Sequence, residues 1–201
     1  MNEKYELTEE FKEIETLREG WLQKIKVYRI RALRAFADVK IGDLGGFVET
    51  KQNLSNMGNA WVCDNAWVRD NAWVCGDAWV CGDAKVYGNA KVYGNAWVRD
   101  NAKVYGNAEV CGDAKVCDNA NIFWCSSIGS RHATTTMFRN KDNGITVTCG
   151  CFMGTLEEFA AIVEKEHGEN IFGKEYKLLI ELAKIHFGLQ DETKGEEENG
   201  I

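Results

Sequence analysis

Apolar residues in the middle of the chain recur with a strict period of six. From Asn59 to Trp124 the sequence divides into 11 hexads in one unbroken phase, of which NAWVCD and NAKVYG are typical. Alanine stands second in every hexad and valine fourth, until Ile122 takes the valine position in the last one. This period is too long for simple strand alternation and does not fit the 3.6-residue turn of an α-helix. It predicts a solenoid of short strands.

Each hexad also predicts which side chains point inward. The alanine and the valine lie two residues apart and therefore share one face of a short strand, while the residues between and after them share the other. The corner between two hexads consists of a Gly or Asp at the end of one and an Asn or Asp at the start of the next. These residue types tolerate the backbone of a sharp corner. We therefore expect an inner column of Ala and Val, with Trp, Lys, Tyr, Cys and Arg outside.

The region before the hexads predicts a helix and a cap. Leu7, Phe11, Ile14 and Leu17 recur at helical spacing and Gly20 follows, so residues 1–20 are expected to form an amphipathic helix. Residues 21–58 are expected to cap the solenoid, whose first coil would otherwise leave an unpaired edge. A run of basic residues in this cap partly alternates, which fits either a positive strand face or a plainly solvated one: Lys24, Lys26, Arg29, Arg31 and Arg34.

We expect the β-helix to cover residues 59–128, because Ile128 continues the column of Val and Ile beyond the last hexad. The region that follows has a different pattern, and we expect it to form a ββαα domain over residues 129–187. TTTMFR and ITVTCGCF have strand composition and are joined by NKDNG, whose Asn-Gly is a hairpin signal. Thr155 and Glu158 form a capping box before a first helix that Gly168 ends, and a second helix is expected over 174–187. Residues 188–201 form an acidic tail expected to be disordered.

Composition narrows the class of protein. The 201 residues carry 24 Lys and Arg against 31 Asp and Glu, a net charge of -7, which argues against nonspecific binding of nucleic acid. The N-terminus lacks an apolar signal segment, and no window is apolar enough for a membrane span. We therefore expect a cytoplasmic protein that binds no membrane. Its eight Cys are then expected to be free thiols.

The hexads resemble the hexapeptide-repeat family of left-handed parallel β-helices, in which three hexads make one triangular coil of 18 residues. The order of segments, YRIRALRAFADVKIGDLGGFVETKQNLS before the hexads and IGSR, GCFMGTLEEF and EKEHGEN after them, resembles a group of hexapeptide-repeat proteins carried by phages and prophages. The resemblance implies a mainly β fold with a left-handed β-helix, assembly as a homotrimer, and a viral or prophage setting, in which the protein would lie in the cytoplasm of the host cell. It brings no catalytic residue to this chain.

Coils of 18 residues would sort the outward side chains into columns. One face would stack Trp61, Trp79 and Trp97 beside Arg99, and another would stack Tyr87 and Tyr105. Exposed aromatic ladders mark either subunit packing or a platform for a planar ligand. The outward cysteines alternate with Tyr and Arg, so we expect no metal site there.

Two candidate sites lie beyond the hexads. The polar segment around Ser130, Arg131 and His132, with Arg139 nearby, could cradle an anion, or it could be only a polar exit turn. Cys149 and Cys151 could supply a nucleophile with His167 or half a metal site, although packed thiols are the simpler interpretation.

These features predict a non-enzymatic, oligomeric binding protein without a cofactor. Hexapeptide-repeat acyltransferases need a general base on or beside the coils, whereas residues 59–124 contain no His and no inserted loop. We expect a homotrimer of phage origin that acts in counter-defence. Grooves between its subunits, lined by the stacked aromatic residues and by Arg99, Arg131 and His132, would sequester a nucleotide-like signal or block a host defence protein. The alternatives are a structural scaffold trimer and an acyltransferase.

Overall fold

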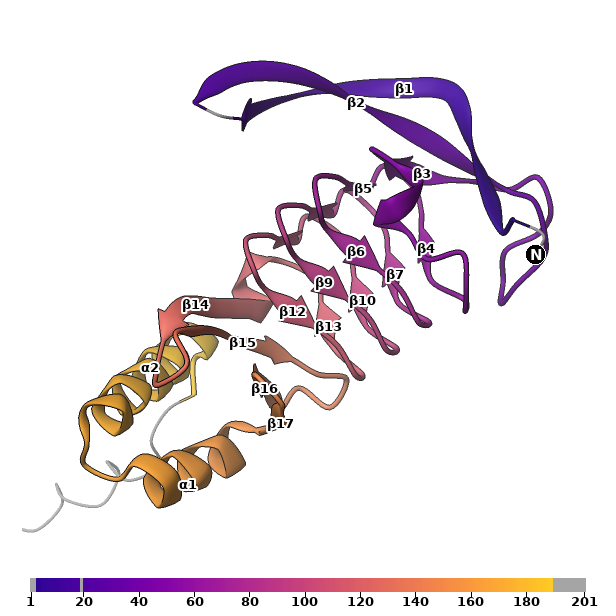
Figure 1. Cartoon of the computed structure of the whole chain (residues 1–201). Coiled ribbons are helices and arrows are strands. Elements are labelled where there is room, and N and C mark those ends of the chain that lie inside the picture. The colour runs from indigo at the N-terminus through magenta and orange to yellow at the C-terminus, as the bar shows by residue number, and fades with distance from the viewer. Residues whose placement is uncertain (1–2, 19, 190–201) are drawn as a thin grey trace, which may run out of the picture.

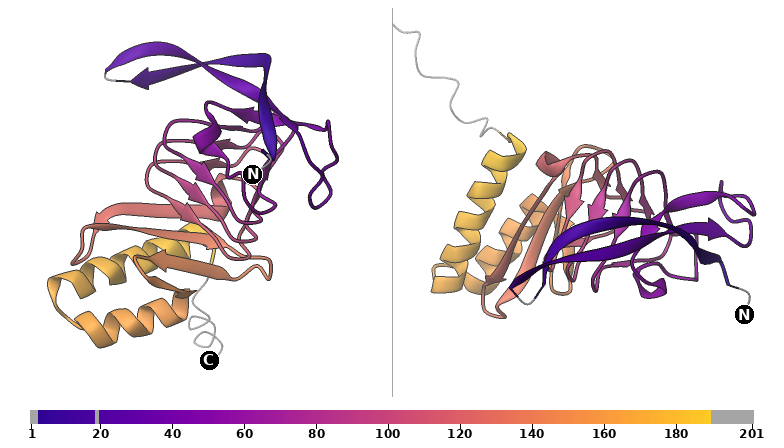
Figure 2. Two further views of the ribbon diagram at one scale, coloured as in Figure 1. Left: turned by 45° about the vertical axis from the view of Figure 1, so that its right-hand side comes forward. Right: turned by 90° about the horizontal axis from the view of Figure 1, so that it is seen from above.

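The structure, a computed structural model, describes residues 3–18 and 20–189. It is mainly β: a parallel β-solenoid of about four turns carries a long hairpin at its N-terminal end and a sheet with two helices at its C-terminal end (Figure 1). Turned views show the same linear order of the three parts, with the hairpin running beside the coils (Figure 2).

The solenoid strands stack in three columns, each joining residues 18 positions apart. β4 pairs with β7 through Trp61 and Trp79, and the pairing is parallel, as in every column. The column orders are β3-β5-β8-β11, β6-β9-β12 and β4-β7-β10-β13. The strands are β3 (Leu44–Val48), β4 (Trp61–Val62), β5 (Trp67–Val68), β6 (Trp73–Val74), β7 (Trp79–Val80), β8 (Lys85–Val86), β9 (Lys91–Val92), β10 (Trp97–Val98), β11 (Lys103–Val104), β12 (Glu109–Val110) and β13 (Lys115–Val116).

The predicted inner column of Ala and Val is confirmed. Each hexad valine from Val62 to Val116 is completely buried, and so are most of the alanines that alternate with them. The backbone of each coil bonds to the next; for example, the amide of Trp79 donates to the carbonyl of Ala96 at 2.9 Å. Because burying a valine contributes about 1.5–3 kcal/mol, this column stabilises the coils collectively.

The corners follow the predicted residue types. Gly94 and its equivalents have φ near +70°, and Asp64, Asp70 and Asp100 adopt the same left-handed region where Asp replaces Gly. A Cβ on Gly94 would lie 2.8 Å from the amide nitrogen of Gly112, so the stacked corners also leave no room for a side chain there. Asp118 occupies the equivalent position but is extended, and it instead caps a short 3-10 helix (Asn119–Asn121) where the regular coils end.

The solenoid begins earlier than the expected boundary at residue 59. β3 pairs in parallel with β5, and Leu54 bridges Val74, so residues from Leu44 onward form a first, irregular coil. Gly46 takes the place of the hexad alanine, since a Cβ there would lie 2.6 Å from the carbonyl oxygen of Ala66. The spacing of six between Val48 and Leu54 was the signal that could have shown this.

The predicted N-terminal helix is wrong. Residues Tyr5–Arg18 form strand β1, which pairs antiparallel with β2 (Trp21–Ala32). The partner strand overrides the helical spacing because it satisfies the backbone and neutralises the acidic side chains. The basic run of β2 faces the glutamates of β1: Glu13 lies 3.9 Å from Lys24 and Glu10 lies 2.8 Å from Arg29.

The hairpin and the segment after it cover the first coil. β2 pairs with β3, so the hairpin extends one column of the solenoid into a six-stranded sheet. Farther along β1, Arg18 binds Glu49 at 2.8 Å and Asp70 at 2.6 Å. Lys4 is fully buried, donates to the carbonyl of Ala60 at 2.8 Å, and has its pKa lowered to about 8 by burial. The open end of the inner column is therefore closed by side chains from the N-terminal segment.

The C-terminal region contains four strands rather than the two expected. Ile122 still belongs to the solenoid core, but its strand turns away from the coils and pairs antiparallel with the next one, so the column does not continue to Ile128. ITVTCGCF is not one strand but two strands joined by a turn. The sheet order is β14 (Ile122–Ile128), β15 (Ala133–Arg139), β16 (Ile145–Cys149) and β17 (Phe152–Thr155).

Two helices cover this sheet. α1 (Leu156–His167) has the predicted capping box of Thr155 and Glu158 and ends at Gly168. α2 (Ile171–Phe187) begins three residues earlier than 174, because Asn170 caps it by accepting a hydrogen bond from the amide of Gly173. Among the described residues, neither helix is long and apolar enough to cross a membrane. The predicted disordered tail lies almost wholly outside the described residues.

Substitution of Trp61 tests whether the N-terminal segment closes the first coil. Trp61 is 2% exposed beneath the rings of Tyr5 and Phe36, whereas Trp73, at the same hexad position, is 45% exposed. We expect Trp61→Ala to lower the free energy of unfolding by about 3–5 kcal/mol, because it opens a cavity at the covered end. Trp73→Ala, the matched control, should cost about 1 kcal/mol or less. Equal losses for both variants in denaturant unfolding would contradict this account of the cap.

Candidate functional site

The first aromatic face is a tryptophan column, but only part of it is open. The structure contradicts an outward, available position for Trp61, because the N-terminal segment buries it. Trp79 and Trp97 form the predicted ladder, with ring centroids 6.0 Å apart and planes 15° from parallel. Trp97 is 48% exposed. The available surface of this column is therefore centred on Trp97.

A hollow of about 400 Å³ lies beside Trp97. Strand pairing places Lys115 next to Trp97 in the same column, and Arg99 lies two residues farther along the chain. Lys141 reaches the hollow from the turn between β15 and β16, so the C-terminal sheet completes a wall that the hexads alone do not form. The described lining consists of Asn95, Trp97, Arg99, Asp113, Ala114, Lys115 and Lys141.

The charges of this hollow favour an anion. Three basic side chains face a single acidic one, Asp113, which Lys141 binds at 2.8 Å. That hydrogen bond, with another from Asn95, holds the pKa of Asp113 below its usual value, so this pair remains ionised. Lys115 has no hydrogen bond or ion pair within the described part of the chain. The Arg99 guanidinium donates to the thiol of Cys117 at 3.1 Å and lies 3.7 Å from the carboxylate of Asp100. The spare cationic charge lies beside an exposed aromatic ring.

The second aromatic face is covered at Tyr87, whereas Tyr105 is 41% exposed. Tyr87 and Tyr105 stack as predicted, with centroids 5.1 Å apart and planes 6° from parallel, and the edge of Trp124 meets Tyr105. The guanidinium of Arg69 lies 4.5 Å from the Tyr87 ring centroid and is almost entirely buried. Burial raises the pKa of the Tyr87 phenol. Arg69 fills the place that a planar ligand would need on Tyr87, which the sequence pattern did not reveal.

The polar segment after the coils does not form the single anion site that was predicted. Arg139 is occupied: its guanidinium donates to the carbonyls of Asn143 at 3.0 Å and Phe187 at 2.7 Å, which ties β15 to the end of α2. His132 lies exposed in a tight turn with φ of 48°. Ser130 and Arg131 instead line a pocket under α1 and do not meet Arg99, which lines the Trp97 hollow.

That second pocket, of about 430 Å³, also contains the cysteine and histidine candidates. The expectation that Cys149 and Cys151 lie on one strand is wrong, because Cys151 lies in the turn between β16 and β17. Both nevertheless line the pocket together with His167. Tyr176 from α2 is in the pocket too, and its role there was missed because α2 shows only its core-facing periodicity in the sequence.

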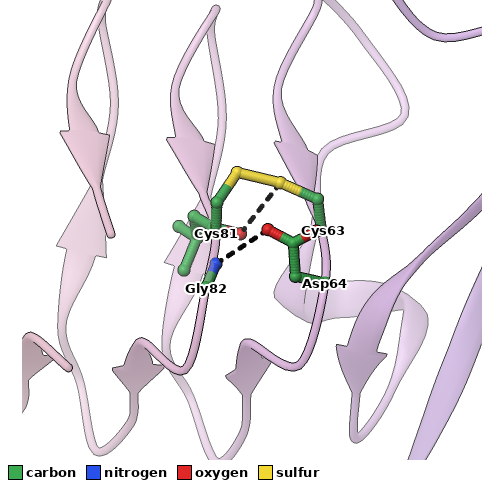
Figure 3. The surroundings of a disulfide bond; sticks show 5 residues. Cys63, Asp64, Cys81 and Gly82 are labelled. Carbon is green, nitrogen blue, oxygen red and sulfur yellow. Dashed lines mark hydrogen bonds between the residues drawn. A yellow bond between two sulfur atoms is a disulfide. The ribbon is translucent and has the colours of Figure 1, made fainter. Parts of the chain in front are cut away.

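Two of the outward cysteines form a disulfide. Cys63 and Cys81, one coil apart in the tryptophan column, are bonded to each other (Figure 3). The expectation that all eight cysteines are free thiols is therefore wrong for this pair. Asp64 lies beside them and accepts a hydrogen bond from the amide of Gly82 at 3.0 Å. The two sulfurs and this carboxylate lie within 4.8 Å of one another, a grouping that could hold a metal ion only after reduction.

The fold defines the chain as a β-solenoid protein with appended N-terminal and C-terminal elements. Comparison with known protein families and with curated proteins finds no match. Its function must therefore be argued from its own surfaces.

The disulfide is directly testable. Alkylation without reductant, followed by peptide mapping, should find Cys63 linked to Cys81 and the other six cysteines alkylated. Since the bond closes a loop of 18 residues, reduction should lower the free energy of unfolding by about 3 kcal/mol. Cys63→Ser should remove this sensitivity to reductant, and Cys75→Ser should preserve it. Full alkylation of all eight cysteines before reduction would show that the pair is free in solution.

Proposed function

We propose that this protein is a non-enzymatic, oligomeric binding protein built on a left-handed β-helix of hexapeptide repeats. By its resemblance to phage and prophage proteins, it acts inside a host cell. There it sequesters a planar anionic ligand of the nucleotide type, in the manner of a counter-defence protein. The ligand stacks on Trp97 and its phosphates pair with the basic side chains of the hollow.

The observation that carries this proposal is the half-exposed Trp97 beside cations that have few partners. Trp79 stacks behind it and fixes the ring, so the ring is preorganised for a flat ligand. Lys115 and Arg99 line the same hollow and supply positive charge beside the ring. On the other aromatic face, Arg69 already covers Tyr87, and the edge-on contact of Trp124 with Tyr105 takes part of the remaining ring.

Binding rather than catalysis is favoured by the chemistry of the coils. No His occurs between residues 59 and 124, and no His is among the described residues that line the hollow beside Trp97. Acyl transfer on a β-helix needs such a general base. The groups present can hold an anion but have no basic partner with which to activate a nucleophile.

Self-association is supported by an apolar stripe on the outer face of α2. Ile171, Leu178, Leu182 and Ile185 are each at least half exposed and are spaced by seven, four and three residues. This spacing is the a/d pattern of helices that pack against other helices. Lys174 borders the stripe and adds a positive charge that an acidic side chain of another copy can pair. We therefore assign the stripe to the equivalent helix of another copy, in a trimer whose subunits share a threefold axis.

Ligand binding is tested with AMP, ATP and cyclic di-AMP as probes, read out by quenching of tryptophan fluorescence. Trp97→Lys should weaken binding about tenfold or more, since stacking on an aromatic ring contributes about 1–3 kcal/mol per base. Trp73→Lys is the matched control because Trp73 is equally exposed on another face, and lysine occurs naturally at that hexad position. Its affinity should equal that of the unmodified protein.

If none of the three probes quenches at millimolar concentration, and native mass spectrometry finds no small molecule on protein purified from cells, the sequestering function is rejected. If Trp73→Lys weakens binding as much as Trp97→Lys does, the site is not the Trp97 hollow.

The oligomer is tested by light scattering. The unmodified chain should have three times the mass of one chain, and the double variant Leu178→Gln with Ile185→Gln should shift toward a single chain at micromolar concentration. Both side chains are more than 70% exposed, so the fold should be retained. Ile41→Gln, equally exposed at the opposite end, should leave the mass unchanged. A monomeric unmodified chain would overturn the trimer.

A further inference from the structure

The pocket between the C-terminal sheet and its two helices has the features of a second ligand site. Segments that are far apart in the sequence converge on it: the turn after β14, the turn between β16 and β17, the end of α1 and the first half of α2. Its volume of about 430 Å³ lies in the range of small-molecule sites. The described lining consists of Ser130, Arg131, Ala133, Cys149, Gly150, Cys151, Phe152, Phe159, Ile162, Val163, Glu166, His167 and Tyr176.

One wall of the pocket is aromatic. Phe152 and Phe159 lie 5.4 Å apart between ring centroids, and Phe159 meets the edge of Tyr176 at 5.5 Å. His167 follows at 5.7 Å from Tyr176, so four rings form a continuous surface. Phe159 and Tyr176 are buried and fixed by this packing. The wall therefore offers a rigid apolar surface of the kind that holds a flat organic group.

The polar groups of the pocket are fixed as well. The thiol of Cys149 accepts a hydrogen bond from the hydroxyl of Thr135 at 3.2 Å and lies 3.7 Å from the hydroxyl of Tyr176. The Tyr176 hydroxyl also packs on Gly129, where a Cβ would come within 1.9 Å of it. Burial, with a further contribution from Cys149, raises the pKa of Tyr176 to about 12, so the phenol keeps its proton at neutral pH. The hydroxyl is thus a positioned donor.

One charge of the pocket is unmatched. Arg131 lines the pocket but makes no hydrogen bond or ion pair with any residue that the structure describes. Its guanidinium lies beside Gly150, with Nη1 3.7 Å from the position that a Cβ on Gly150 would take. The carboxylate of Glu166, the acidic group of the lining, lies 3.8 Å from the ammonium of Lys165 instead. A free guanidinium beside an apolar wall favours a carboxylate that carries an apolar body.

We propose that this pocket binds a small organic carboxylate, with its flat apolar part against Phe152 and Phe159 and its carboxylate on Arg131. The site is separate from the Trp97 hollow, and the proposal does not depend on the function assigned to that hollow. It gives the C-terminal sheet and helices a binding role of their own, for an acid with an aromatic or similarly flat skeleton.

The first test uses 2-naphthoate as the probe and the pocket's own thiols as reporters. With the full-length protein, a saturating concentration of 2-naphthoate should slow alkylation of Cys149 and Cys151 by iodoacetamide about fivefold or more, measured for each cysteine by peptide mass spectrometry. Cys75 and Cys117, half-exposed on the solenoid, are internal controls and should react at unchanged rates. Unchanged rates at Cys149 and Cys151, or equal slowing at all four cysteines, would overturn the proposal.

The second test separates the charge from the apolar wall by calorimetric titration. Arg131→Gln should weaken binding of 2-naphthoate about tenfold or more, since a hydrogen bond to a charged group is lost. It should leave the affinity for the uncharged analogue 2-naphthalenemethanol unchanged. Because Arg131 has no partner within the described residues, the variant should fold normally.

Arg99→Gln is the matched control, and it should bind 2-naphthoate as the unmodified protein does. The same variant should weaken binding of ATP in the Trp97 hollow. The two proposed sites can therefore be rejected separately, one by ATP binding and the other by 2-naphthoate binding. Equal affinity of Arg131→Gln and the unmodified protein for 2-naphthoate would reject the assignment of Arg131.

Discussion

The parallel pairing of strands that lie 18 residues apart is the constraint on which the rest of the molecule depends. It favours a small residue and an aliphatic residue inside each coil position, which are alanine and valine in the regular hexads, and it favours a left-handed backbone at the regular corners. Once the pairing is fixed, every outward side chain lies directly over its counterpart in the next coil. Ladders of Trp, of Tyr and of Asn follow from this geometry without further specification.

The same constraint creates two ends that must be closed. At the first coil, the N-terminal hairpin continues one column as an antiparallel edge, and Trp61 becomes part of the core under Tyr5 and Phe36. At the last coil, Asp118 leaves the corner conformation and β14 leads into a separate sheet. Both additions satisfy backbone groups that a bare solenoid would expose, and both also bring chemistry to the coils, since Lys141 from the C-terminal sheet completes the hollow beside Trp97.

Side chains at equivalent positions of the repeat differ in their exposure in the folded protein. Trp61, Trp73 and Trp97 occupy the same hexad position, yet the first is buried and the other two are nearly half exposed. Tyr87 and Trp97 both belong to ladders, yet Arg69 covers Tyr87, whereas Trp97 is nearly half exposed. The candidate site is therefore defined less by the repeat than by what the neighbouring segments cover. The C-terminal pocket shows the same principle, because its rings and thiols come from segments that the repeat does not include.

The hexad period alone determined the solenoid, its inner residues, its corners and the order of its outer columns, since local spacing in a repeat maps directly onto stacking. The capping box of Thr155 and Glu158 was equally readable, because both partners lie within one turn. Other features needed the tertiary structure. The spacing of Leu7, Phe11, Ile14 and Leu17 favours a helix, but the opposite charges and backbone of β2 select a strand. The disulfide of Cys63 and Cys81, the burial of Trp61 and the convergence of Arg131 with Tyr176 likewise arise from contacts between distant segments, whose energies no local pattern records.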